Sequence, residues 1–109
     1  MDAISRARQL IQEFRKLDPE MPAQQIEAFL WLAFSDGKNQ SEVGAFTEGS
    51  KSAAQRWFLK LGEKGLNGKP GLGLIEVRQG VADGRERQAF LTPKGRQLVS
   101  KLRSIMSAP

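Results

Sequence analysis

The chain contains no cysteine and no histidine. Their absence excludes disulfides, thiol redox sensing, His or Cys metal sites, and nucleophilic catalysis that depends on histidine. The remaining residues show no carboxylate pair, no nucleophile with a base and no metal-ligand cluster at an interpretable spacing, and Gly71 and Gly73 lack the context of a phosphate-binding loop. We therefore expect no enzyme, no metal and no cofactor.

Long hydrophobic runs are also absent. The longest run covers residues 28–34, far below the roughly 20 residues that a membrane-spanning helix needs. No secretory signal is recognisable. A cytoplasmic or nucleoid location is compatible with these absences. We expect a cytoplasmic protein with no membrane partner.

The chain is basic and short. Its 109 residues, 39% of them hydrophobic, suffice for one compact domain that spans residues 1–109. Seventeen Lys and Arg against twelve Asp and Glu give a net charge of +5. This balance favours polyanionic partners such as DNA or RNA. Charge alone, however, does not distinguish a nucleic-acid-binding protein from a soluble basic protein that binds no nucleic acid.

An amphipathic helix is predicted over residues 50–64, closed by Gly65. Its apolar and polar side chains occupy opposite faces of the helical wheel: Ala54, Trp57, Phe58 and Leu61 against Ser52, Gln55, Arg56 and Glu63. Ser50 is suited to cap the start, and Gly65 tolerates left-handed backbone after the last turn. The outer side chains can reach phosphates and base edges in a major groove, so we interpret this segment as a recognition helix.

Three helices are predicted before it, and the first two lie within residues 2–34. Residues 2–17 carry an apolar stripe at helical spacing, made of Ile4, Ala7, Leu10, Ile11, Phe14 and Leu17. The two prolines of residues 18–22 break this pattern. The second helix, from about Pro22 to about Phe34, is apolar around most of its circumference, which places it in the centre of the fold.

A short third helix is predicted at Asn39, which forms a capping box with Glu42. Val43 and Phe46 give this helix its buried side. Residues 47–50 then turn the chain directly into the recognition helix. Two short helices joined through a tight glycine-containing turn are typical of a helix-turn-helix, and also of small helical bundles that bind no DNA.

A β-hairpin is predicted after an irregular loop. The loop, residues 66–73, is rich in glycine and can continue neither neighbouring element. Residues 74–78 and 86–91 have strand character, with a turn at residues 79–84 between them. Three basic residues lie around the tip of this hairpin: Arg78, Arg85 and Arg87.

A final helix is predicted from Thr92, its N-cap, and Pro93, its first residue. Its apolar face carries Leu98, Leu102, Ile105 and Met106. The complete order is four helices, two strands and one helix. The fold class is therefore mainly α with a small β-hairpin, a winged helix-turn-helix.

The segment from about Met21 to Leu98 resembles the MarR (multiple antibiotic resistance regulator) family of winged-helix transcription regulators. Residues 39–43 look like the start of the family's third helix, and residues 50–52 with Arg56, Leu61 and residues 63–66 look like its recognition helix and exit. The most specific match is Asp83-Gly-Arg85, followed by Leu91-Thr-Pro-Lys-Gly95. The resemblance implies that Asp83 positions the wing and that Arg85 enters the minor groove.

The chain departs from this family in three places. Gly84 stands where the family has the first arginine of the wing motif, so Arg87 is the candidate to replace that contact. Residues 67–73 look like an insertion, and one helix follows the wing where the family usually has two. The usual dimerisation region is thus abbreviated.

We predict a sequence-specific transcription regulator that binds double-stranded DNA as a homodimer through its first and last helices. In the alternative arrangement, both terminal helices simply pack against the second one. The predicted DNA-binding residues are Gln40, Ser41, Ser50, Lys51, Ser52, Gln55, Arg56, Lys60, Arg85 and Arg87, with Asp83 positioning the wing. The resemblance also permits a small-molecule effector, without naming the residues that would bind it.

The alternative function is a protein-interaction module of the replication or transcription machinery. In that case the basic surface meets an acidic partner. Leu59, an apolar residue expected to be exposed on the presumed DNA face, and the glycine-rich insertion support this alternative. Binding to random genomic DNA at low salt separates the two functions.

Overall fold

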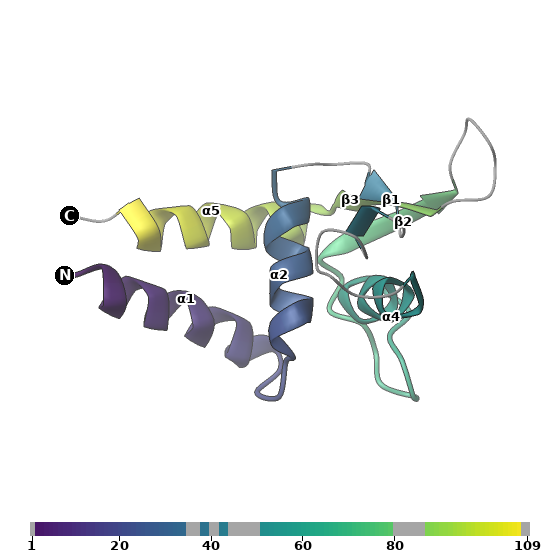
Figure 1. Cartoon of the computed structure of the whole chain (residues 1–109), viewed down its shortest axis with the longest axis horizontal. Helices are drawn as coiled ribbons and strands as arrows, with labels where there is room; N and C mark the ends of the chain where they lie inside the picture. Colours follow the sequence, from purple (N-terminus) through teal and green to yellow (C-terminus); the bar gives the residue numbers. More distant parts are fainter. Residues whose placement is uncertain (1, 35–37, 40–41, 44–50, 80–86, 108–109) are drawn as a thin grey trace.

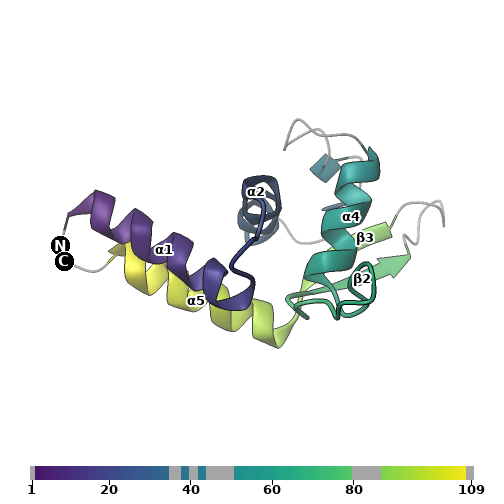
Figure 2. The same ribbon diagram turned by 90° about the horizontal axis from the view of Figure 1, so that it is seen from below.

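The computed structural model describes residues 2–34, 38–39, 42–43, 51–79 and 87–107. The body is elongated, 47 × 29 × 27 Å, and its elements form two groups (Figures 1 and 2). The arm consists of α1 (Ala3–Leu17) and α5 (Pro93–Ser107), which lie antiparallel to each other; the head consists of α2 (Ala23–Leu32), α4 (Lys51–Leu61) and a small sheet. The start of α1 and the end of α5 lie together at the free end of the arm.

The helix α1 begins and ends where its flanking residues require. The Asp2 carboxylate accepts a hydrogen bond from the Ser5 backbone N–H at 2.8 Å, which satisfies a donor that the helix start leaves free. After Leu17 the backbone of Asp18 is extended, because the residue before a proline disfavours helical geometry. The predicted first helix is confirmed.

Part of the apolar stripe of α1 is not covered within the chain. Phe14 is fully buried, whereas Ile4 is 79% exposed and Ile11 is 42% exposed. On α5, Met106 is likewise 42% exposed. The arm therefore presents apolar side chains to its surroundings.

Charge also holds the arm together. Glu13 of α1 forms ion pairs with Lys101 of α5 at 2.9 Å and with Lys16 at 2.8 Å. The hydrogen bond with Lys16, followed by the one with Lys101, lowers the pKa of the Glu13 carboxyl below its ordinary value. At neutral pH this carboxylate is thus charged and forms ion pairs with one lysine from each helix of the arm.

The helix α2 contributes most of its length to the core, as predicted. Phe29 is fully buried and meets the Phe14 ring edge-on, with 5.8 Å between centroids. The helix ends at Leu32, two residues before the predicted boundary. Phe34 therefore lies outside it and is 69% exposed, so its assignment to the apolar circumference was wrong.

The sheet contains a strand that the sequence pattern did not predict. It has the order β1-β3-β2, in which β1 (Lys38–Asn39) pairs antiparallel with β3 (Arg87–Leu91). Asn39, which the sequence assigned to the start of a helix, is thus part of a strand. Glu42 and Val43 are helical and Val43 is fully buried, whereas Phe46 and the predicted turn at 47–50 lie outside the described residues.

The predicted hairpin is confirmed in its strands. The strand β2 (Ile75–Gln79) pairs with β3 in the register Ile75 to Leu91 through Gln79 to Arg87. On the side of the hairpin that faces the core, Ile75, Ala89 and Leu91 are buried. Residues 80–86 lie outside the described part of the chain.

Candidate nucleic-acid interface

The helix α4 separates its two faces as the sequence predicts. The side chains of the inner face are at most 5% exposed: Ala54, Trp57, Phe58 and Leu61. Ser52, Gln55 and Arg56 are exposed on the outer face. This amphipathic division orients the helix, because burying the apolar face directs the polar face to solvent.

Two other residues of α4 lie between these faces. Lys60 is half-buried, with its ammonium 5.7 Å from the centroid of the Trp57 ring. A cation at this distance from an indole is attracted by the negative face of the ring. Leu59, one turn after Gln55, is also half-buried and lines the same groove as Gln55, so it is less exposed than predicted.

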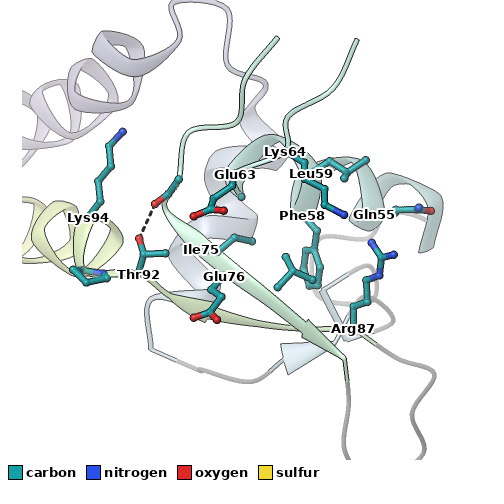
Figure 3. Close-up of a pocket in the computed structure, with 14 residues that line it drawn as sticks. Gln55, Phe58, Leu59, Glu63, Lys64, Ile75, Glu76, Arg87, Thr92 and Lys94 are labelled. Carbon is teal, nitrogen blue, oxygen red and sulfur yellow. Dashed lines mark hydrogen bonds between the residues drawn. The ribbon is translucent and has the colours of Figure 1, made fainter. Parts of the chain in front are cut away.

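A groove of about 640 Å³ is lined by residues of α4 and of the strands β2 and β3 (Figure 3). Phe58, Ile75 and Val77 supply apolar walls. Gln55 lines the groove from α4, and Arg87 points toward it from the start of β3. The structure therefore brings together two predicted site residues that are far apart in the sequence.

The charged residues along the groove are of both signs. Lys64 and Lys94 line it, as do Glu63 and Glu76. The Lys94 ammonium donates a hydrogen bond to the Leu72 carbonyl at 2.8 Å. Arg87 and Lys64 are the cations that lie between helix and strands with exposed side chains and no ion pair within the described part of the chain.

Arg78 has a different role from the one predicted for the hairpin arginines. Its guanidinium forms an ion pair with Glu76 at 3.0 Å and stacks 4.3 Å from the centroid of Phe90. The hydrogen bond from Arg78 also lowers the pKa of the Glu76 carboxyl. Arg78 thus supports the strands, and of the two hairpin arginines that the structure describes, Arg87 is directed to the groove.

The loop after α4, predicted to be irregular from its glycine content, contains a regular hydrogen-bonded turn. Leu66 and Lys69 exchange two backbone hydrogen bonds, 3.2 and 3.1 Å long, around Asn67 and Gly68. Both central residues have positive φ, 55° and 78°, as a two-residue type I′ hairpin turn requires. The Asn-Gly dipeptide was the available sequence signal for this turn.

Several predicted site residues lie outside the described part of the chain: Gln40, Ser41, Ser50, Asp83 and Arg85. Lys51 begins α4, but its side chain is not among those described. Their roles stay predictions. Within the described ranges no three acidic side chains gather as they would around a metal ion, and no helix there has the length and apolar content to cross a membrane.

Solved structures share this arrangement. MepR from Staphylococcus aureus, in complex with DNA, superposes with a TM-score of 0.69 at 19% identity over 93% of this chain and 73% of its own. A MarR transcriptional regulator from Methanosarcina mazei Go1 gives 0.66 at 22% identity, over 95% and 74%. Reduced AbfR bound to DNA gives 0.65 at 17% identity, over 96% and 74%.

No protein-family profile matches the chain, and no curated protein matches it in sequence. The likeness to the solved structures covers almost the whole chain, and at these identities it establishes the fold. The protein has the MarR-like winged-helix fold that its sequence predicted.

Proposed function

We propose that this protein is a sequence-specific transcription regulator that binds double-stranded DNA, with α4 in the major groove and the β2–β3 wing in the minor groove. Two proteins of the same fold, MepR and AbfR, were solved in complexes with DNA. The net charge of +5 suits a polyanion. Double-stranded DNA as the partner and a cytoplasmic location, both expected from the sequence, are part of this proposal.

The observation that carries the proposal is the outer face of α4 beside the groove. Gln55 and Arg56 are exposed in the second turn, where an amide and a guanidinium can make bidentate contacts to adenine and guanine edges. Arg87 lies across the groove from Gln55. A duplex with α4 in its major groove would therefore also contact Arg87 at the base of the wing.

A symmetric dimer is part of the same proposal. The arm presents Ile4, Ile11 and Met106, each at least 42% exposed, and a second arm would remove these side chains from water. Two heads joined in this way would read an inverted repeat, with half-site centres about 10 base pairs apart.

The test compares α4 variants on an operator selected from genomic DNA and on a scrambled duplex. Gln55→Ala and Arg56→Ala should each cost about 1 to 3 kcal/mol on the operator, if the side chain contacts a base edge, and much less on the scrambled duplex. Gln97→Ala and Arg103→Ala, on the exposed side of α5, remove the same groups far from α4 and serve as matched controls.

Two results would count against the proposal. If both α4 variants bind the operator as tightly as the unchanged protein, α4 is not a recognition helix. If the unchanged protein binds no duplex at low salt, the protein-interaction function gains the preference. Circular dichroism of each variant shows whether it is folded, and neither side chain belongs to the core.

A further inference from the structure

The turn that follows α4 has a regular, hydrogen-bonded backbone geometry. We name residues 64–70 the exit hairpin. Its turn at Asn67 and Gly68 is closed by the two backbone hydrogen bonds between Leu66 and Lys69. A two-residue turn of this type has a defined backbone twist, which fixes the direction of the residues on either side.

The end of α4 holds this hairpin in place. The N–H groups of residues 71–74 donate to four carbonyls at the end of the helix: Gly71 to Glu63, Leu72 to Lys60, Gly73 to Gly62 and Leu74 to Leu61, at 2.8–3.2 Å. A helix end normally leaves such carbonyls without partners in the chain. Gly71 approaches so closely that a Cβ there would collide with the Gly62 carbonyl.

The exit hairpin carries two cations with no ion pair inside the described part of the chain. Lys64 and Lys69 are both exposed, as is Asn67 at the turn. Lys64 also lines the groove to which Arg87 contributes. Cationic side chains therefore continue from the base of the wing, through the groove, to the far end of α4.

The position of the hairpin relates this charge to DNA. In Figure 1 the connection from α4 to β2 lies on one side of α4, and the far ends of β2 and β3 lie on the other. A helix in the major groove and a wing in the adjacent minor groove have one phosphate backbone between them. That backbone would pass through the groove lined by Arg87 and Lys64.

We propose that the exit hairpin is a second phosphate-contacting element, in which Lys64 contacts the backbone between α4 and the wing, and Lys69 contacts the backbone that borders the major groove on the other side of α4. This inference rests on the proposed function. Because phosphate contacts position a protein without reading bases, the hairpin would lengthen the footprint and raise affinity on every sequence alike.

The test uses the double variant Lys64→Gln, Lys69→Gln in the full chain. Each lost phosphate contact should reduce the slope of log K against log salt by about 0.9, hence by about 1.8 per protomer. Affinity should fall by a similar factor on operator and scrambled duplex, and hydroxyl-radical protection should be lost at one edge of each half-site. The charge-preserving pair Lys64→Arg, Lys69→Arg should retain slope, affinity and footprint.

The matched control removes the same net charge from the arm. Lys16 on α1 and Arg103 on α5 are exposed, and Lys16→Gln with Arg103→Gln should leave slope, footprint and the mass in analytical ultracentrifugation close to those of the unchanged protein. If the lysine variant and this control behave alike, the exit hairpin does not contact DNA, although the proposed function stands. If the unchanged protein binds no duplex, both proposals fail together.

Discussion

Replacing Gly95 by alanine should destabilise the protein, although the same change stabilises most helices. Gly95 lies in the first turn of α5 and is buried. Alanine is preferred over glycine in a helix by about 1 kcal/mol. At this position, however, the added Cβ would collide with the Leu74 carbonyl oxygen and would lie 3.3 Å from Leu91 Cδ2.

The cost follows from the partner of that carbonyl. The Leu74 oxygen accepts a hydrogen bond from the Thr92 N–H at 3.1 Å, so it cannot move away without lengthening this bond. Overpacking of this kind costs about 1–3 kcal/mol, and a weakened hydrogen bond adds about 1 kcal/mol. After subtraction of the helix preference, Gly95→Ala should lower the free energy of unfolding by about 1–3 kcal/mol, or roughly 4–8 °C in Tm for each kcal/mol.

Urea unfolding at one fixed protein concentration measures this change, because association makes stability depend on concentration. Ser104→Ala, at an exposed position of α5, makes a similar change toward alanine without a close neighbour, and should raise stability by a few tenths of a kcal/mol. A Gly95→Ala protein that is more stable than the unchanged protein would refute the argument, since the close approach of α5 to Leu74 would then cost nothing.

Two further predictions concern the arm. Ile11→Glu should convert the proposed dimer to a monomer in analytical ultracentrifugation, whereas Gln12→Glu, on a neighbouring exposed position, should not. An unchanged protein that is monomeric at every concentration would contradict the proposed dimer. Glu13→Gln should lower stability near pH 7, because the folded state holds the pKa of this carboxyl below its ordinary 4.5. That stability is present above the unfolded pKa and disappears as the pH falls through the folded one, so unfolding at about pH 3 should show a smaller difference between the two proteins. A difference that stays constant with pH would exclude this role for Glu13.

Local signals in the sequence were sufficient for the long helices and the wing strands. Asp2 and Thr92 cap α1 and α5 through their own side chains, at 2.8 and 3.1 Å from backbone N–H groups three residues on. Caps and apolar periodicity involve neighbours in the chain, so residue types alone reveal them. The same periodicity oriented α4 and identified Gln55 and Arg56 as exposed.

Contacts between distant segments could not be predicted in this way. The strand β1 has two residues, and it is a strand only because it pairs with Gln88 and Ala89. Leu59 lines a groove together with residues of β2 and β3, and the periodicity of α4 cannot show these neighbours. The attachment of residues 71–74 to α4 uses backbone groups alone. Gly71 permits the close approach, but a glycine in the sequence does not reveal which segment it approaches.

The carbonyl and amide of Leu74 have a consequence for how the whole molecule can move. Its N–H donates to Leu61 at the end of α4, and its oxygen accepts from Thr92 and lies against Gly95 at the start of α5. Tilting the arm against α4 would thus require breaking backbone hydrogen bonds, not only sliding side chains. We therefore expect the arm and α4 to move together, and in the proposed dimer the contact between the two arms would set the separation of the two α4 helices.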